Sequence, residues 1–139
     1  MAEGSSSGTL DVTVVSPARQ LYEGEAQWVT APGADGQLGI RPMHADLVAA
    51  LGAGPLRIGT SGGEVTRFAV KGGFLKVGDN RVTILVDRAV TEKDVNESEA
   101  QQELQDTLAE LQHPRTDEEF AALLEERAWS EARIKLSRS

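Results

Sequence analysis

The strongest constraint on this chain is a change in amino-acid usage near residue 92. All 14 glycines lie at or before Gly78, where they separate short apolar segments. From Asp94 onward Glu, Gln, Ala and Leu dominate, and these residues favour helices. A chain of 139 residues has room for one compact domain with an appendage. We therefore predict an α+β protein in which a strand-rich module, residues 9–91, precedes a helical module, residues 92–139.

Composition excludes several other classes. No apolar run reaches the ~18 residues that cross a bilayer, and the first residues lack the basic and apolar parts of a signal peptide. We expect residues 1–8, which are small and polar, to form a disordered leader. The chain has no cysteine, which excludes disulfides and thiolate metal sites. Neither module has a broad basic face, so we do not expect nucleic-acid binding.

Alternating apolar residues indicate strands in the first module. Leu10, Val12 and Val14 alternate with polar residues, as in a half-buried strand. We expect strand breaks at Gly24 and at residues 52–55, and hairpin turns at residues 61–63 and 78–80. Strands at this spacing predict a β-sandwich or a flattened barrel.

Residues 31–47 form the most distinctive stretch of this module, and we predict that they form a loop. Glycine and proline bend the backbone, while apolar residues lie between them. Such a loop can present Leu38, Ile40, Met43 and Leu47 as a contact surface. The alternative is a buried turn that links two strands.

The second module predicts a helical hairpin. Asp94 and Glu97 have the spacing of a capping pair, and Thr116 with Glu119 forms a second. Residues 113–115, His-Pro-Arg, separate the two helices. The apolar stripes are narrow: they consist of Ala100, Leu104, Leu108 and Leu111, and of Phe120, Leu123, Leu124, Ala128, Ile134 and Leu136. Such a hairpin needs the sandwich or a partner to cover it.

Charge is unevenly distributed over the two modules. Residues 1–91 carry 8 basic and 9 acidic residues, a net charge of -1, and residues 92–139 carry 6 and 13, a net charge of -7. The last thirteen residues reverse the sign, because four basic residues accompany Glu131 alone. The hairpin is therefore acidic with a basic end.

We find no catalytic or metal-binding constellation in the sequence. The two histidines, His44 and His113, lie in different modules and have no second histidine at helical spacing. Gly33, Gly36 and Gly39 lack the Gly-Lys-Ser/Thr ending of a phosphate loop. We therefore expect neither an enzyme nor a cofactor. The open alternatives are a small-molecule-binding β-sandwich with a helical lid and a hydrolase of unfamiliar pattern.

A series of short motifs resembles the epsilon subunit of F-type proton-translocating ATP synthases. They include Ala-Pro-Gly at residues 31–33 and Gly-Gln-Leu-Gly-Ile at residues 36–40. Together they cover nearly the whole first module, at residues 14–17, 21–25, 31–33, 36–40, 42, 44–45, 47, 54–58, 68–70, 72–77 and 79–85. The resemblance implies a ten-stranded β-sandwich followed by two helices.

The resemblance also implies a place in a rotor. In that family the sandwich packs beside the gamma shaft, and its glycine-rich loop contacts the membrane ring of c subunits. The ring contact would then fall at Gly36, Gln37, Leu38, Gly39 and Ile40, and the shaft contact near Pro42 and His44. Many relatives have an acidic residue at the position of Gln37, so here a neutral hydrogen bond would replace a charge pair. The protein would lie at the cytoplasmic face of the bacterial inner membrane, attached only through the complex.

The hairpin would act as a brake in such a complex. In the family it either folds against the sandwich or extends into the alpha/beta catalytic head, where basic residues stop ATP hydrolysis. Arg127, Arg133 and Lys135 match that basic character. Some relatives bind ATP through an Ile-Asp-x-x-Arg-Ala motif, of which Asp94 remains here while Glu97 replaces the arginine. We therefore predict weak or absent nucleotide binding.

Overall fold

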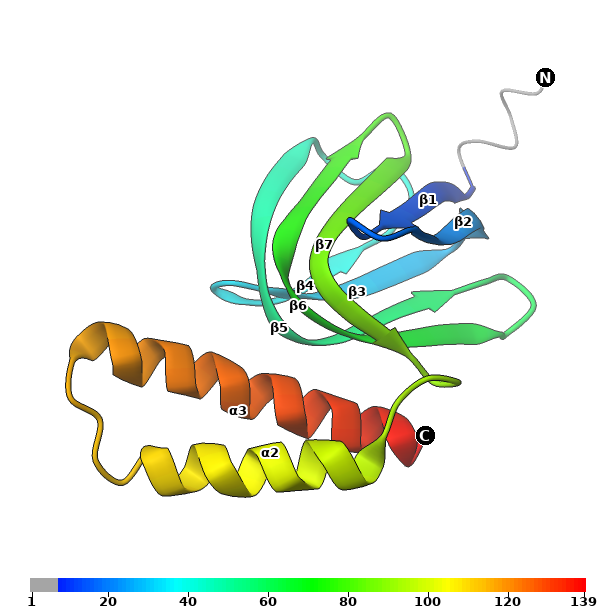
Figure 1. The fold of residues 1–139 in the computed structure, drawn as a ribbon. Helices are drawn as coiled ribbons and strands as arrows, with labels where there is room; N and C mark the ends of the chain where they lie inside the picture. Colours follow the sequence, from blue (N-terminus) through cyan, green and yellow to red (C-terminus); the bar gives the residue numbers. More distant parts are fainter. Residues whose placement is uncertain (1–7) are drawn as a thin grey trace.

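The computed structural model describes residues 8–139, and the leader predicted for residues 1–8 lies outside this part except for Gly8. Within residues 8–139, seven strands precede two helices (Figure 1). The strands are β1 (Leu10–Val15), β2 (Gln20–Ala26), β3 (Trp28–Gly33), β4 (Gly36–Ile40), β5 (Leu47–Gly59), β6 (Val65–Gly78) and β7 (Arg81–Thr91). The helices are α2 (Glu97–Glu110) and α3 (Asp117–Ser137). No helix among the described residues is long and apolar enough to cross a membrane.

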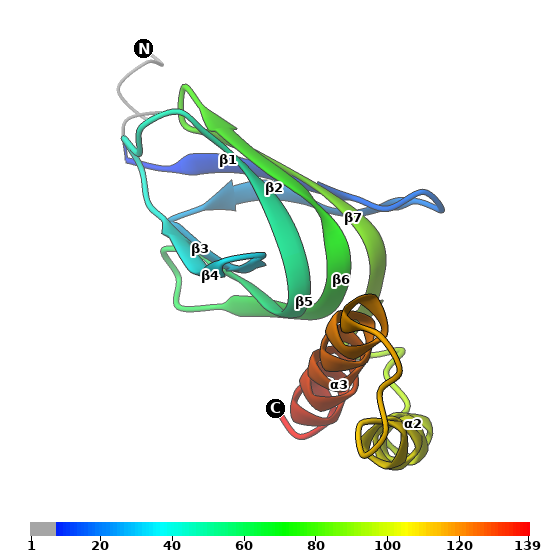
Figure 2. The same cartoon turned by 90° about the vertical axis from the view of Figure 1, so that its left-hand side faces the viewer.

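All the strands belong to one sheet in the order β2-β1-β7-β6-β5-β3-β4. β1 and β7 pair in parallel, and the other neighbours pair antiparallel. The sheet curves so that its two ends face each other, which gives the sandwich seen in Figures 1 and 2. The core fills the space between these layers and includes the predicted Leu10, Val12 and Val14. The predicted β-sandwich followed by two helices is thus confirmed in outline.

The predicted count of ten strands is wrong, because β5, β6 and β7 are continuous strands of 13, 14 and 11 residues. β6 continues through Gly72 and Gly73, which have φ angles of +76° and +126°. Phe68 and Val70 point inward before this glycine pair and Leu75 and Val77 after it, so the inward set shifts by one residue. The glycines therefore bend the strand rather than end it. Each long strand supplies segments to both layers of the sandwich.

The two strand breaks that we expected from the sequence are absent. β5 runs through residues 52–55, and β2 continues past Gly24 to Ala26. Gly54 has a packing role instead, since a Cβ there would lie 2.9 Å from the Cβ of Pro32 on the neighbouring strand. Gly54 therefore marks the close approach of β5 to β3 rather than a turn.

The stretch at residues 31–47 is mainly a β-hairpin, not a loop as predicted. β3 ends at Gly33. The turn consists of Ala34 and Asp35, and β4 follows it. β4 is an edge strand of the sheet. After β4, residues 41–46 of this stretch lack helix or strand. The alternative of a turn between two strands was therefore closer to the structure.

Both predicted hairpin turns are present. β5 and β6 are joined at residues 60–64, and β6 and β7 are joined by Asp79 and Asn80. Asp79 and Asn80 have positive φ angles of 53° and 59°, as a tight type I′ turn requires. The Oδ1 atom of Asn80 accepts a hydrogen bond of 2.6 Å from the amide of Met43, which ties the 41–46 loop to this turn.

The helices begin at polar caps, one of which differs from the prediction. The side chain of Asn96, not Asp94, caps α2 by accepting a hydrogen bond from the amide of Glu99. Asp94 lies in the turn before the helix, where its amide donates to Thr91. For α3 the predicted cap is confirmed, because Thr116 Oγ1 accepts a 2.9 Å hydrogen bond from the amide of Glu119.

The hairpin docks on the sheet through α3, while α2 packs against α3 away from the sheet (Figure 2). Trp129, Ala132 and Leu136 of α3 pack on Ala69, with Ala53, Val90 and Val95 at the rim. Of the predicted apolar stripes, Ala100, Leu123 and Leu136 are buried, but Leu108 and Phe120 are 37% and 44% exposed. The sandwich therefore covers the hairpin mainly along one side of α3.

Candidate functional site

The predicted ring-contact residues lie on the edge strand β4. Gly36, Gln37 and Gly39 are exposed, and Leu38 is half-buried. Ile40 is 1% exposed and belongs to the core, so its predicted place on a contact surface is wrong. Alternation along a strand explains the difference, because successive side chains point to opposite faces.

The predicted shaft-contact residues lie in the loop that follows. Pro42 and His44 are half-buried, while Met43 between them is 72% exposed and has a φ angle of 68°. His44 Nδ1 lies 2.7 Å from the carbonyl oxygen of Ala45. A carbonyl only accepts, so Nδ1 carries a proton and donates here.

The structure brings part of both predicted sets together. Gly39, Ile40 and His44 line a hollow of about 280 Å³ beside Trp28 on β3. The edge strand and the loop therefore form one continuous surface at this side of the sandwich.

A second exposed surface crosses the outer face of the sheet, and the sequence analysis missed it. Ala50, Phe74, Leu85 and Val15 stand directly opposite one another on β5, β6, β7 and β1. Phe74 is 58% exposed and Leu85 51%. We call these four residues the outer apolar row. Apolar groups grouped in this way mark contact sites for proteins more often than isolated ones do.

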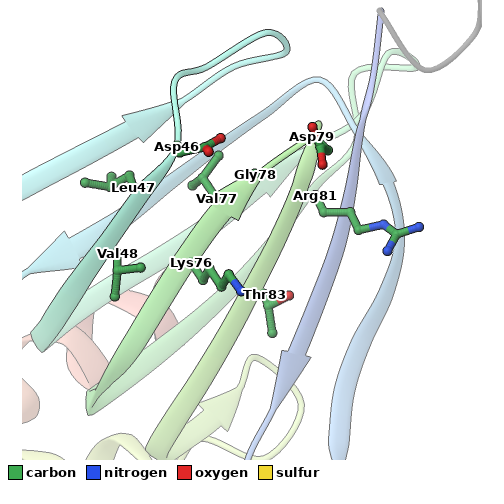
Figure 3. A pocket seen from close by; sticks show the side chains of 9 residues that line it. All are labelled: Asp46, Leu47, Val48, Lys76, Val77, Gly78, Asp79, Arg81 and Thr83. Carbon is green, nitrogen blue, oxygen red and sulfur yellow. The ribbon is translucent and has the colours of Figure 1, made fainter.

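Charged groups adjoin the outer apolar row in a broad depression of about 840 Å³ (Figure 3). Val48, Lys76 and Thr83 line it from three neighbouring strands, and Val48 is 68% exposed. Asp46 and Asp79 lie toward the strand ends in Figure 3. An open face with apolar residues and charges of both signs suits a protein partner better than a small molecule.

Arg133, one of the predicted regulatory residues, is buried inside the hairpin. Its Nη2 atom lies 2.5 Å from Glu103 Oε1 on α2 and 3.2 Å from Ser130 Oγ. Its guanidinium lies 4.8 Å from the ring centroid of Trp129, and Arg88 of β7 lies 5.1 Å from the same centroid. Trp129 thus stacks with two cations, one from each module.

The other two predicted regulatory residues are more accessible. Arg127 is half-buried and Lys135 is exposed. Within residues 8–139 neither has a carboxylate partner. A further ion pair, Lys71 with Glu126, joins β6 to α3. The docked hairpin is therefore held by one apolar patch and by several charged contacts.

The predicted nucleotide-site remnant contacts cations of the same chain. Asp94 lies 3.4 Å from Arg19 at the surface. Glu97 accepts hydrogen bonds from Arg138 at 2.7 Å and Ser137 at 2.9 Å. These hydrogen bonds, that of Arg138 first, lower the pKa of the Glu97 carboxyl below its ordinary value. Glu97 therefore stabilises the hairpin, joining the start of α2 to the end of α3.

Residues with the chemistry of a metal site do not gather in the described part of the chain. No group of three or more His, Cys, Asp or Glu side chains there has the arrangement to hold a metal ion. His44 lies in the β module and His113 in the turn between the helices.

Known proteins with similar sequences identify the family of this chain. Residues 9–92 match the family model described as the ATP synthase delta/epsilon chain, beta-sandwich domain. An ATP synthase epsilon chain from Syntrophomonas wolfei is 40% identical over 131 residues, which cover 93% of this chain and 94% of the relative. The chain therefore belongs to the epsilon-chain family of F-type ATP synthases.

Solved structures share this fold. A chain in the Euglena gracilis mitochondrial ATP synthase, in an assembly of OSCP, F1 and c-ring, aligns with a TM-score of 0.78 and 19% identity. That alignment covers 95% of this chain and 82% of the other. A chain in the central stalk and c-ring of the Tetrahymena thermophila mitochondrial enzyme gives a TM-score of 0.66 and 22% identity, covering 91% and 94%. At these identities the likeness concerns the fold.

Proposed function

We propose that this chain is a non-catalytic subunit of the central stalk, in which residues 9–91 couple the gamma shaft to the c-ring and residues 92–139 inhibit ATP hydrolysis. The observation that carries this proposal is the outer apolar row. Its residues Phe74 and Leu85 are exposed on the outer face of the sheet, whereas the apolar residues of the inner face are buried in the core. Its partner in this proposal is the gamma subunit.

The shaft contact is proposed to combine this row with the loop at residues 41–46. The hydrogen bond from the amide of Met43 to Asn80 holds the loop at the β6–β7 turn, which borders the same outer face. Exposed Met43 and Val48 extend the apolar area from the row toward Pro42 and His44. Apolar surface with a charged margin is the usual composition of a stable protein contact.

The ring contact is proposed for the β3–β4 hairpin. Gly36, Gln37 and Gly39 are exposed there, and β4 has no strand neighbour on its outer side among the described residues. Gln37 can donate and accept hydrogen bonds but carries no charge. We therefore propose a neutral polar contact with the ring loops, together with Leu38.

The brake is proposed to act by release of α3. While the hairpin is docked, Arg133 is held by Glu103 and Trp129 and is not available to a partner. Extension of the hairpin would separate α2 from α3 and expose Arg133 beside Arg127 and Lys135. A cluster of cations would then face the catalytic head of alpha and beta subunits. In this proposal Arg133 either pairs with Glu103 in the docked hairpin or contacts the catalytic head, but it does not do both at once.

The same contacts support weak or absent nucleotide binding at Asp94. Glu97 presents a negative charge there, and Arg138 already neutralises it. A triphosphate would have to displace this pair and would meet the carboxylate. The proposed location is the cytoplasmic face of the bacterial inner membrane, through the complex.

Deletion of residues 92–139 tests the proposed division of roles. The truncated chain, assembled into the ATP synthase, should raise ATP hydrolysis and leave proton-coupled ATP synthesis largely intact. The full-length chain assembled in parallel is the control. Unchanged hydrolysis would contradict the brake, and loss of coupled synthesis would contradict the role of residues 9–91.

A further inference from the structure

The two edge strands of the sheet, β2 and β4, differ in how they are protected against pairing with another strand. β2 carries Glu23 and Glu25, and its pairing with β1 shifts register next to Val15. Charged side chains and such irregularities hinder the addition of a further strand. β4 has no charged residue between Gly36 and Ile40, and it pairs with β3 in unbroken register. β4 is therefore the edge that can accept another strand.

Pro32 of β3 determines which backbone groups of β4 face this edge. In an antiparallel pair, residues that exchange two hydrogen bonds alternate with residues that exchange none. Pro32 has no N–H, so its pair with Gln37 cannot exchange two bonds. The pairs on either side of it do so instead, which leaves the N–H and C=O groups of Gln37 and Gly39 pointing away from β3. Within residues 8–139 no turn or loop bond occupies these groups.

The space beside the edge is open. Gln37 and Gly39 are exposed, and a Cβ added at Gly39 would meet nothing within 4 Å. In Figure 1 the tip of the β3–β4 hairpin, in light blue, extends to the left of β5. The amide of Ala34 in this tip donates a 2.9 Å hydrogen bond to the carbonyl oxygen of Ala50 on β5, which holds the hairpin in place. The edge is thus fixed in position and accessible.

Asp35 and Arg41 flank β4 at equal distances from its centre. Each lies three residues from Leu38, and both are exposed. Within the described part of the chain neither forms an ion pair. β4 therefore has a negative charge before it and a positive charge after it, each without a partner of opposite sign.

We propose that β4 pairs with β4 of a second copy of this chain, in an antiparallel arrangement centred on Leu38. The two-fold axis of such a dimer places residues at equal distances from Leu38 opposite each other. Gln37 then faces Gly39 of the second copy, and their outward backbone groups exchange two hydrogen bonds. Asp35 faces Arg41 of the second copy. By symmetry each of these contacts occurs twice.

The charges select this register over its neighbours. The outward backbone groups would also match in dimers centred on Gln37 or on Gly39. Asp35 would then face Gly39 or Met43 instead of a cation. In the register centred on Leu38, the two Leu38 side chains form a close pair that exchanges no hydrogen bonds. Leu38 is only half-buried in the single chain, so this contact would remove further apolar surface from water.

The dimer would exist only outside the rotor. Residues 36–40 are also the proposed ring contact, so a copy paired in this way would not reach the ring at the same time. This consequence rests on the proposed function, whereas the pairing of two copies does not. Dimerisation is measured on the chain alone, and its outcome is therefore independent of any contact with gamma or the ring.

Sedimentation equilibrium of the full chain tests the proposal. We expect a reversible equilibrium of monomer and dimer with a dissociation constant below about 0.1 mM, since the interface is small. A chain that remains monomeric up to about 1 mM would overturn the proposal and leave the edge to a strand of a different protein.

Charge reversal tests the register. D35R alone places two arginines opposite each other at both ends of the dimer, and R41D alone places two aspartates there. Each variant should therefore raise the dissociation constant about tenfold or more. An equimolar mixture of D35R and R41D restores opposite charges at both ends, and it should associate within about threefold of the parent chain. A mixture that associates no better than either variant alone would overturn the register.

Two further comparisons separate this pairing from general effects. E110R makes the same change of charge on α2, away from the sheet, and should dimerise like the parent chain. G39P removes an outward N–H, which an edge strand tolerates, and should weaken dimerisation about tenfold or more, whereas G39A keeps this N–H and should dimerise like the parent. Equal dimerisation of G39P and G39A, or equal losses in E110R and D35R, would contradict the proposal.

Discussion

Arg133 Nη2 on α3 lies 2.5 Å from Glu103 Oε1 on α2, so a cation predicted for contact with a partner is paired inside its own hairpin. The arginine side chain is 5% exposed and the glutamate side chain 42%. Glu99 adds a second carboxylate oxygen at 3.8 Å. The pair therefore links the two helices and couples release of Arg133 to their separation.

Replacement of Glu103 tests this link. E103Q leaves the buried guanidinium of Arg133 with a weaker partner, and we expect the free energy of unfolding to fall by about 1–2 kcal/mol. The loss is smaller than for a fully buried ion pair, because Glu103 is partly exposed to solvent and Glu99 remains as a second partner. Urea unfolding followed by circular dichroism at 222 nm measures it. E110Q, at an exposed position of the same helix, is the matched control. Equal stability of the two variants would show that the pair contributes nothing.

Replacement of Gly73 tests the bend in the long strands. A Cβ at this position would lie 1.9 Å from the carbonyl oxygen of Leu85, and the φ angle of +126° is unfavourable for any other residue. We expect G73A to lose about 3 kcal/mol or more of stability, or not to fold. G39A, where a Cβ meets nothing within 4 Å, should change stability by less than about 1 kcal/mol. A stable G73A protein would mean that β6 does not need this bend.

Local patterns predicted much of the fold. Alternation identified β1, the glycine-rich turns identified both long hairpins, and Thr116 with Glu119 identified the start of α3. The strand count was wrong because glycine has two roles that look alike in a sequence. It ends a strand at a turn, and at Gly72–Gly73 it lets one strand bend between layers. Only the pairing across β5, β6 and β7 distinguishes these roles.

The candidate surfaces were predicted less completely, for a different reason. Ile40 lies within a segment rich in exposed residues, yet alternation along β4 turns it into the core. Phe74 and Leu85 look like core residues by composition, but Leu85 lies between buried Ile84 and Val86, and Phe74 comes directly before buried Leu75. Strict alternation about Leu75 and Ile84 would have placed them outside. The pairing of Arg57 with Arg67 depends on the register that the β5–β6 turn sets.

Acid should weaken the hairpin through Glu97. The hydrogen bonds from Arg138 and Ser137 lower the pKa of this carboxyl below its ordinary value of 4.5. Because the pKa of Glu97 is lower in the folded state, its carboxylate stabilises the folded chain fully at pH values above the unfolded-state pKa. This stabilisation is lost as the pH falls through the folded-state pKa. The relevant window therefore lies below about pH 4.5.

Unfolding by urea at pH 7 and at pH 3 measures this dependence. E97Q should lose stability relative to the parent chain at pH 7, and the difference should shrink at pH 3, where the parent carboxyl becomes protonated. E125Q, an exposed position on α3, is the control and should keep the parent pH profile. A difference between E97Q and the parent that is the same at both pH values would exclude the proposed role of the charge.

The central claim is that the outer face of the sandwich binds the gamma subunit, and titration calorimetry of the two purified subunits measures it directly. The parent chain should bind gamma one to one, and L85E, which places a charge in the outer apolar row opposite Phe74, should weaken binding about tenfold or more. L108E, which places the same charge at an exposed apolar position on α2, should bind like the parent. Failure of the parent chain to bind gamma, or equal binding by L85E and the parent, would contradict the account.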